Sequence, residues 1–541
     1  MTTLTMVQQP VSADESTWSL LSVVGDELVS STNSCIVATA VILFFLLSYM
    51  STPRLDPREP PLLKPALPLI GHIIGLIRHQ ARYHFILYRR SRQSAVTLPM
   101  LTGKMYAVWD PTMITTGLRN KNLSTTPLLV SSTPPLTGVG KETMDIIRGP
   151  NGDCALVDDV LLKTGPAMAG AYLQQMNAAA LSDIGDYLSQ IDEASVPDLW
   201  MWIRRLMALP TSRATFGHGD PFSKDPALEQ LLFDFANDIP KLVLGFIPAT
   251  IAAKGYHARA VLQEAFIKYY SSRQDEDSST SGFVKVRARE FRGYGVRDDD
   301  IGRAEIMLPF AVMLNTFPAL FWFFCHVMSR PNLVERIRKE VEGVTSRTAE
   351  EATLDLTAVD RTCPLLVSCY RETLRLANHQ VSTRTVLKDT VLTDSKGKSY
   401  LLKEGVMVHF SIGASLRNME FWGEDVETFK PERFLRFGDK KDDVDPDRPG
   451  GPRAMRTAFI PFGGGQHLCP GRNFAFAEMI AVIATLTLGY DVEPENETWE
   501  LPTLATASIV DAITKPTTGK KLSFKIKRRR EWETIRWRYR I

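Results

Sequence analysis

Residues 459–476, FIPFGGGQHLCPGRNFAF, combine three consecutive glycines, one cysteine and the start of an apolar helical pattern. Gly463, Gly464 and Gly465 permit a backbone turn that side chains would block. Cys469 stands just before the predicted helix, where unpaired amide groups and the positive end of the helix dipole favour a thiolate over a thiol. The segment therefore predicts a turn that presents a reactive or metal-binding sulfur.

Three other interpretations compete with this one. A glycine loop before a helix is typical of phosphate binding, but the Gly-Lys-Ser/Thr sequence of such loops is absent here. A zinc site needs more ligands than His467 and Cys469 supply. A buried structural cysteine is common, but it leaves the glycines unexplained. The six cysteines form no CxxC pair and are typical of a reduced, cytosol-facing protein.

The spacing Phe462-x-x-Gly465-x-His467-x-Cys469-x-Gly471 resembles the haem-binding signature of the cytochrome P450 family. The resemblance implies a thiolate-ligated haem b with Cys469 as the axial ligand of the iron. His467 stands where that family usually has arginine, and either cation can donate to a haem propionate. The implied fold is mainly α, with small β-sheets.

Other landmarks of the family follow in order. Glu372 and Arg375 match its E-x-x-R pair, and Arg433 matches the arginine that completes the cluster and braces the cysteine loop; taken alone, the pair would be an ordinary surface ion pair. Arg384 matches an arginine that reaches a haem propionate, and the alternative is a surface arginine. No Trp-x-x-x-Arg pattern occurs near residues 167–180, so that propionate contact is unassigned.

The central helix departs from the family pattern. Val312-Met-Leu-Asn315-Thr316 aligns with Ala/Gly-Gly-x-Asp/Glu-Thr, and Thr316 matches the threonine that helps to deliver protons to dioxygen. Asn315 replaces the acid; an amide cannot relay a proton as a carboxylate does, although it can hold a water. Pro318 cannot donate to the carbonyl of Leu314, so we expect the helix to bend or open there.

The segment Asn315–Trp322, NTFPALFW, resembles a branch that includes cholesterol 7α-hydroxylase, sterol 12α-hydroxylase and prostacyclin synthase. Thr316 favours oxygen insertion by a monooxygenase that uses O2 and NADPH-derived electrons. The alternative is a reductase-independent isomerase acting on a peroxide or epoxide, and a non-enzymatic haem carrier is a third possibility. Fold and branch analogy suggests a terpenoid, steroid or polyketide substrate of fungal secondary metabolism.

The N-terminus predicts a membrane anchor. Residues 31–50 are uncharged and long enough for one bilayer crossing, after an acidic leader over 1–30. Positive charge first occurs at Arg54, so the positive-inside rule places the leader in the lumen and residues 69–541, the haem domain, in the cytosol at the endoplasmic reticulum. The alternative is a buried core helix. Residues 51–68 are a proline-rich, stiff hinge or a simple linker.

A second uncharged run, residues 306–328, is also long enough to span a membrane. Its prolines and polar residues favour a long buried central helix instead. Apolar spacing near 3.6 predicts helices over Leu228–Leu244, Arg303–Ser329, Asn332–Val344, Thr362–Leu376 and Asn473–Leu488. Strands are expected over Tyr400–Val408 and Lys521–Lys527, and solvated loops over Ser271–Gly282 and Phe437–Arg453.

Charge and composition narrow the partners. The net charge of +2 gives no attraction to nucleic acid. Between Lys515 and Arg540, eleven Lys and Arg face two Glu, which predicts a solvated tail or, alternatively, a surface for anionic lipid or a partner. The resemblance implies NADPH-cytochrome P450 reductase, the lipid bilayer and a lipophilic small-molecule substrate as partners.

Overall fold

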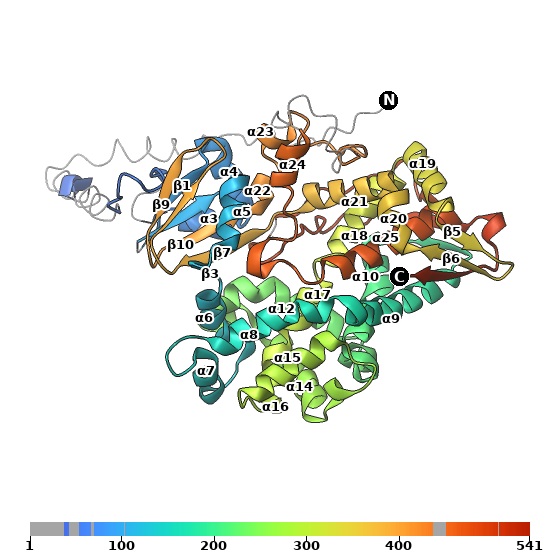
Figure 1. The fold of residues 1–541 in the computed structure, drawn as a ribbon, viewed down its shortest axis with the longest axis horizontal. Helices are drawn as coiled ribbons and strands as arrows, with labels where there is room; N and C mark the ends of the chain where they lie inside the picture. The colour runs from blue at the N-terminus through green and yellow to red at the C-terminus, as the bar shows by residue number, and fades with distance from the viewer. Residues whose placement is uncertain are drawn as a thin grey trace.

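The computed structural model describes residues 37–39, 41–42, 53–65, 70–101, 103–435, 451–506 and 508–541 (Figure 1). The predicted leader, most of the predicted anchor and most of the loop over 437–453 lie outside these residues. Within the anchor, residues 37–39 and 41–42 are helical and exposed. A span across a membrane is therefore neither described nor contradicted at the N-terminus.

Helices make up most of the described chain, as expected (Figure 1). In chain order they are α3 Ile73–His79, α4 Arg82–Ser91, α5 Pro111–Arg119, α6 Thr126–Thr137, α7 Lys141–Arg148, α8 Ala155–Thr164, α9 Gly170–Ser189, α10 Leu199–Phe216, α11 Pro221–Lys224, α12 Leu228–Val243, α13 Pro248–Ile251, α14 Ala253–Ser271, α15 Gly282–Gly293, α16 Asp298–Glu305, α17 Met307–Met313, α18 Thr316–Met328, α19 Pro331–Glu342, α20 Leu356–Thr362, α21 Pro364–Ala377, α22 Ile412–Ser415, α23 Met419–Trp422, α24 Pro452–Ala458 and α25 Arg472–Gly489.

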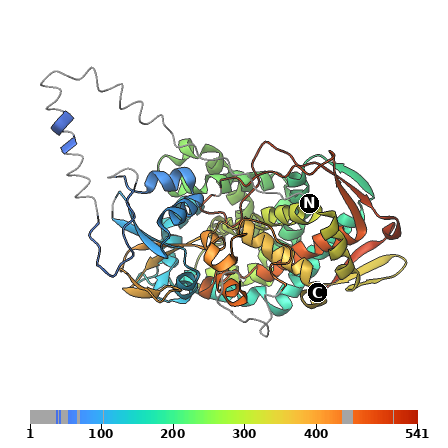
Figure 2. The ribbon, with the colours of Figure 1, turned by 90° about the horizontal axis from the view of Figure 1, so that it is seen from above.

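The sheets are small and lie towards the ends of the body (Figure 1, Figure 2). One has the order β1 Ala95–Pro99, β2 Lys104–Val108, β10 Met407–Ser411, β7 Val381–Val386 and β3 Leu123–Ser124. The others are β11 Tyr490–Pro494, β12 Phe524–Arg528 and β4 Glu193–Val196; β13 Arg536–Arg540, β6 Glu351–Asp355 and β5 Thr345–Arg347; and the pair β8 Thr390–Thr393 with β9 Ser399–Leu402. The predicted strand over Tyr400–Val408 is thus split between β9 and β10, because Gly405 turns the chain at φ +77°.

The predicted helices are present, with ends within a few residues of expectation, except that the central one is interrupted twice. Pro309 lacks the amide that would bond Glu305, and α16 ends at Glu305. Pro318 lacks the backbone N–H that would donate to the carbonyl oxygen of Leu314. The helix is interrupted between α17 and α18, at Leu314 and Asn315. The bend expected at Pro318 is confirmed, and its cause is local.

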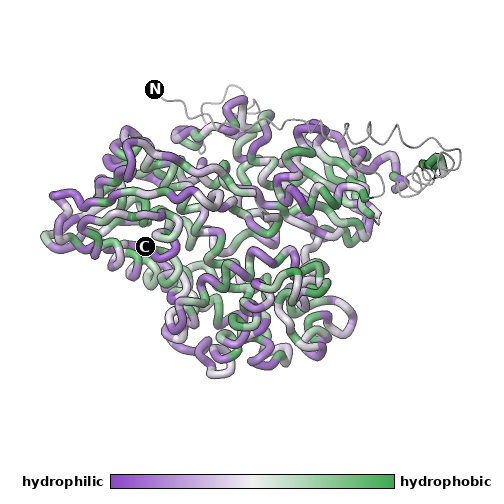
Figure 3. Tube along the Cα trace, turned by 180° about the vertical axis from the view of Figure 1, so that it is seen from behind, coloured by the Kyte–Doolittle hydropathy of each residue, from purple (hydrophilic) through white to green (hydrophobic). Residues whose placement is uncertain are grey.

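The central run is a core element of the body. Every residue of α18 is buried. Within the described ranges, two helical stretches are long and apolar enough to cross a membrane, Asp298–Met328 and Arg472–Gly489, but most of each is covered by the rest of the protein. Figure 3 shows such apolar stretches running through the body, with hydrophilic segments at its outer turns. The interpretation as a buried central helix is confirmed.

The proline-rich segment is attached to the body over its described part. Leu63 N donates to Thr97 O at 2.9 Å, Thr97 N donates to Pro61 O at 2.9 Å, and Leu401 N donates to Arg58 O at 2.8 Å. Glu59 is buried and accepts hydrogen bonds from Lys104 and Tyr106. This stretch therefore runs along the edge of β1 with fixed partners, which a simple linker would lack.

The solvated tail predicted at the C-terminus is wrong. Trp532, Ile535 and Trp537 are buried, and β13 pairs in parallel with β6. Trp537 lies so close to α9 that a Cβ at Gly185 would be 2.6 Å from the Trp537 carbonyl oxygen. The basic residues of β13 alternate with these apolar ones, and the apolar set decides where the strand lies.

Candidate active site

The cysteine loop is a closed turn between α24 and α25. Cys469 N donates to Phe462 O at 3.0 Å, which closes the loop on itself. Gly463 and Gly465 have φ of +72° and +64°, and a Cβ at Gly465 would lie 1.9 Å from the carbonyl oxygen of Leu118 in α5. The glycines are therefore required by backbone conformation and by contact with α5, as the sequence predicted.

The sulfur of Cys469 is mostly enclosed at the start of α25. Burial raises the pKa of the Cys469 thiol, while amide hydrogen bonds from Gly471 and Arg472 lower it only in part. The amide groups at the helix start favour the thiolate, as predicted, but burial outweighs them in the free side chain. Metal coordination deprotonates such a thiol outright. A Cβ at Gly471 would lie 3.9 Å from Sγ, so glycine leaves the space beside the sulfur open.

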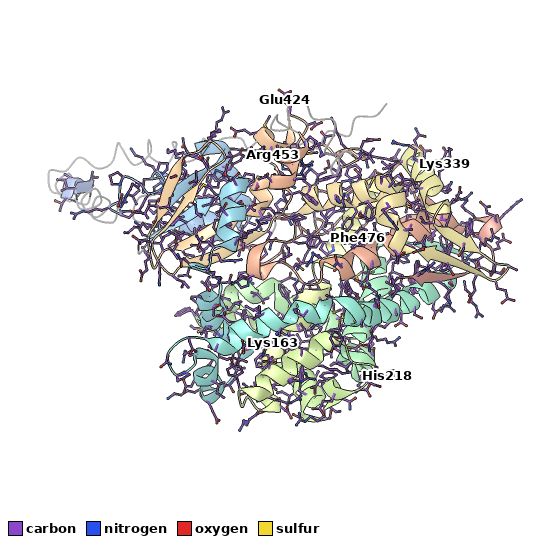
Figure 4. All side chains as sticks on the ribbon, viewed as in Figure 1. Lys163, His218, Lys339, Glu424, Arg453 and Phe476 are labelled. Atoms are coloured by element: carbon purple, nitrogen blue, oxygen red, sulfur yellow. The ribbon has the colours of Figure 1, made fainter. Side chains whose placement is uncertain are left out.

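The start of α25 lies in the interior. Phe476 is near the centre of the body, whereas His218, Lys339 and Glu424 lie at its edges (Figure 4). The ring of Phe476 packs edge-on against Tyr370 of α21, with ring centroids 5.1 Å apart. The first turns of α25 thus pack against α21.

Glu372, Arg375 and Arg433 form a buried cluster. Arg375 donates to both oxygens of Glu372, at 2.8 and 2.9 Å, and neither side chain is exposed. Arg433 Nε donates to Glu372 Oε1 at 2.9 Å. The interpretation as a surface ion pair, the ordinary fate of an i, i+3 pair, is excluded by this burial.

The cluster is connected to the cysteine loop through aromatic packing. Arg375 Nη1 donates to the carbonyl oxygens of Leu416 and Val426, at 3.0 and 2.7 Å, which fixes the segment that contains Trp422. The rings of Trp422 and Phe434 pack on Phe459, the first residue of the loop segment, with centroids 6.3 and 4.7 Å apart. The geometry therefore supports the bracing role that the resemblance implies.

Arg384 and His467 lie next to each other beside the loop. Arg384 is buried and donates to Ser382 Oγ and Thr383 O, but its Nε has no partner in the described structure. Burial lowers the pKa of Arg384 to about 10, with no carboxylate acting against it. Burial and the Arg384 charge lower the pKa of His467. A buried cation without an acid is costly, so Arg384 fits an anionic group that no described residue provides.

Asn315 lies in the break between α17 and α18, and Thr316 is the first residue of α18. Thr316 is buried, and its hydroxyl forms no hydrogen bond with another described residue, not even the usual bond to the carbonyl four residues earlier. Asn315 Oδ1 accepts the backbone N–H of Ala512 at 3.1 Å. The sequence indicates that this amide can hold a water but does not predict the contact, because Ala512 is 197 residues away and carries no sequence signal.

Similarity to known proteins decides the family. The Cytochrome P450 family pattern matches residues 228–524. A cytochrome P450 monooxygenase of Gibberella zeae is 31% identical over 520 residues, covering 95% of this chain and 97% of that protein. The chain belongs to the cytochrome P450 family. Cytochrome P450 monooxygenase nodJ of Hypoxylon pulicicidum is 27% identical, covering 94% and 97% of the two chains.

A more distant relative lies in the branch that the central helix resembles. The 7-alpha-hydroxycholest-4-en-3-one 12-alpha-hydroxylase of Oryctolagus cuniculus is 23% identical over 508 residues, covering 90% of this P450 and 98% of the hydroxylase. The mainly helical P450 fold with small sheets is therefore established for this chain by sequence similarity and by its own elements together.

Family membership implies a haem with a cysteine ligand, and the residues present fit it. An iron requires a sulfur such as that of Cys469, which has open space beside it. The propionates require donors such as Arg384, whose Nε has no partner among the described residues, and His467, on which the Arg384 charge acts. No cluster of three or more His, Cys, Asp or Glu side chains able to hold a bare metal ion occurs in the described ranges.

One polar residue near the loop had no signal in the sequence. Asp158 of α8 accepts from Thr126 Oγ1 at 2.7 Å, and its charge acts to raise the pKa of His467. The family's Trp-x-x-x-Arg contact was sought over 167–180, which is α9 and the turn before it. Asp158 shows that α8 is the helix whose charge acts on His467, and no arginine occurs in α8.

Proposed function

We propose that this P450 is a haem-thiolate monooxygenase that uses O2 and NADPH-derived electrons to hydroxylate or otherwise oxidise a lipophilic small molecule. The observation that carries the proposal is that the chain has both an enclosed sulfur, at Cys469, and a buried guanidinium on which no carboxylate acts, at Arg384. A haem bound there supplies the activation of dioxygen and the oxidation of the substrate. The chain's own side chains supply ligation, orientation and proton control.

Each site residue has a part in holding the cofactor. Cys469 binds the iron, and Gly465 and Gly471 leave room for the turn and for the space beside the sulfur. Arg384 and His467 donate to the propionates, where the Arg384 charge gains the acidic partner it otherwise lacks. Phe462 closes the loop through its carbonyl oxygen.

The buried ion-pair cluster supports the residues that would bind the haem. Glu372, Arg375 and Arg433 keep the loop rigid through the segment that packs on Phe459. A rigid loop matters because a ligand that moves out of position loses both affinity and electronic control.

Proton delivery on the opposite side falls to Thr316. Its hydroxyl is free to accept from water and to donate towards the reacting centre, the two roles that a relay needs. Asn315 keeps its Nδ2 group as a donor to a water, while its Oδ1 accepts from Ala512 N. This division favours oxygen insertion over isomerisation, since an isomerase has no need of a proton relay.

The substrate class rests on the relatives. The similar fungal proteins carry monooxygenase names, and the rabbit relative is named for the 12α-hydroxylation of a sterol derivative. A terpenoid, steroid or polyketide intermediate of secondary metabolism is the substrate class that these names favour.

The cellular setting completes the proposal. The uncharged run over 31–50 and the basic residues after it would anchor the protein as a single-pass protein of the endoplasmic reticulum, with residues 69–541 in the cytosol. Electrons would come from NADPH-cytochrome P450 reductase in the same membrane. Residues 51–68 would set the body at a fixed orientation, because their described part is bound to the edge of β1.

Two measurements test the proposal. The reduced, carbon monoxide-treated holoprotein should show the red-shifted Soret band of thiolate ligation, and Cys469→Ser should lose it; a wild-type spectrum without that band would refute Cys469 ligation. Candidate terpenoid, steroid and polyketide intermediates should then be oxidised only in cells that also express the reductase. Conversion of a peroxide or epoxide without reductase would favour the isomerase, and haem binding without any turnover would favour a carrier.

A further inference from the structure

Residues 510–515, here called the strap, lie against the break in the central helix. Ala512 N donates to Asn315 Oδ1 at 3.1 Å, at the residue before Thr316. The strap is also bonded to the end of α21, where Thr514 N donates to Ala377 O at 2.9 Å. It therefore joins the two helices whose ends surround the proposed proton relay.

The far half of the strap is fixed at several points. Trp322 Nε1 donates to Thr514 O at 2.7 Å, and the Thr514 hydroxyl is hydrogen-bonded to His379 Nδ1. His379 N donates to Ala512 O at 2.8 Å. Ile513 and Thr514 are buried, so this half has little freedom to move.

The first half of the strap, residues 510–512, has one hydrogen bond to the break in the central helix. Among the described residues, the hydrogen bond of Ala512 N to Asn315 is the one that ties the strap to the start of α18; Trp322 is two turns further on. Ala512 and the preceding Val510 are only half-buried, although Val510 packs against the main core. The Ala512 carbonyl stays bonded to His379 N and Ile509 N stays bonded to Gln80, so loss of the Asn315 bond would free the Ala512 amide without unfolding the strap.

The chemistry of the contact determines the orientation of the Asn315 amide. A backbone N–H can only donate, so the atom facing it must be the oxygen. A carboxylate in the same place would accept this bond equally well, whereas an aliphatic side chain would leave the Ala512 amide without a partner. Asparagine is thus used here as an acceptor, a role separate from the water-holding role of its Nδ2.

We propose that Asn315 is a positioning residue that fixes the strap as a wall beside Thr316, so that Val510 and Ala512 limit which ligands fit on that side of the haem. The proposal deepens the monooxygenase assignment and rests on it for the identity of the cavity. The hydrogen bond between Ala512 N and Asn315 Oδ1 is a feature of the folded chain and does not depend on that assignment.

Hydrogen–deuterium exchange of a peptide covering 508–516 tests the contact in the haem-loaded, substrate-free protein. Asn315→Ala should raise exchange at Ala512 by about fivefold or more, the factor that corresponds to the net contribution of one hydrogen bond. Asn315→Asp should keep wild-type exchange because it keeps an acceptor. Asn332→Ala, which removes an exposed amide on α19, is the matched control. Unchanged exchange in Asn315→Ala would overturn the proposal.

Binding of two haem ligands tests the wall. Imidazole and 4-phenylimidazole, titrated by their spectral shift, present a small and a bulky group to the same iron. Asn315→Ala should change the ratio of the two dissociation constants several-fold, with Asn315→Asp close to wild type. If Asn315 served only to hold a water, both variants would leave this ratio unchanged and alter only the peroxide yield, which would overturn the positioning role.

The outcomes also separate this proposal from the assigned function. A wild-type protein that fails to show the thiolate spectrum or reductase-dependent turnover would refute the monooxygenase assignment, while the exchange result at Ala512 would still report the contact. A wild-type protein that passes both, with unchanged exchange and ligand ratio in Asn315→Ala, would refute the positioning role alone.

Discussion

Arg375 places its guanidinium against both carboxylate oxygens of Glu372, at 2.8 and 2.9 Å, and neither side chain is exposed to solvent. Two cations share this one carboxylate, because Arg433 donates to Oε1 as well. Removing the anion leaves Arg375 buried without an ion-pair partner, whereas Arg433 keeps its bond to Asp425.

Glu372→Gln should therefore destabilise the holoprotein by about 3–5 kcal/mol, the usual effect of breaking a buried pair, and should lower haem content. Urea unfolding and the haem-to-protein absorbance ratio measure the two effects. Glu335→Gln, which removes an exposed i, i+4 partner of Lys339, should change stability by less than about 0.5 kcal/mol. Equal effects of the two substitutions would refute the bracing role.

Arg384→Met should speed haem loss about tenfold, because hydrogen bonds to charged groups contribute ~1.5–3 kcal/mol. Transfer of haem to an excess of an acceptor protein measures the rate. Arg336→Met removes an exposed arginine paired with Glu432 and should have no effect. Haem loss at the wild-type rate in Arg384→Met would show that the Arg384 guanidinium does not bind a propionate.

Thr316→Ala should leave the thiolate spectrum intact but lower product formed per NADPH consumed, with the missing electrons recovered as hydrogen peroxide. The expected loss is about 10²-fold, the low end of what a positioned acid–base group contributes. Thr316→Ser keeps a hydroxyl and should keep most of the coupling. Full coupling in the alanine variant would exclude a role for Thr316 in proton delivery.

Glu478 of α25 makes stability depend on pH. Burial raises its pKa from 4.5 to about 8, opposed only by the hydrogen bond from Thr211. The folded state therefore holds a proton that the unfolded chain releases above its own pKa of 4.5, so this contribution is complete below that pH and is lost as pH rises towards about 8.

Glu478→Gln should remove this pH dependence, which amounts to at most about 1.4 kcal/mol per pH unit in the window. Urea unfolding at several pH values between 5 and 8, roughly the span of the shift, compares the slopes. The exposed Glu497→Gln variant should keep the wild-type slope. A Glu478→Gln variant with that same slope would show that Glu478 is charged in the folded protein.

Trp537→Ala tests the docked C-terminus. Trp537 is 1% exposed and its ring fills the space against Gly489, so its truncation should destabilise the protein by about 3–5 kcal/mol. Arg536→Gln, at an exposed position of the same strand, should have little effect. Similar unfolding midpoints for the two variants would mean that the tail contributes no packing energy.

Much of the site could be predicted because its signals are local. The glycines at 463–465 and the cysteine after them are adjacent in the chain, and the break before Thr316 follows from the missing amide of Pro318 alone. The pairing of Glu372 with Arg375 is set by helical spacing. Each of these depends on a few neighbouring residues, so the sequence by itself determines them.

Tertiary structure decided the rest, because burial and long-range contacts depend on how distant segments pack. It turned an ordinary i, i+3 ion pair into a buried cluster, and it made burial outweigh the amide groups around Cys469. It brought Ala512 to Asn315 across 197 residues and buried Trp537 in a tail that reads as solvated. Side-chain type alone predicts neither a neighbour far along the chain nor the loss of water around a charge.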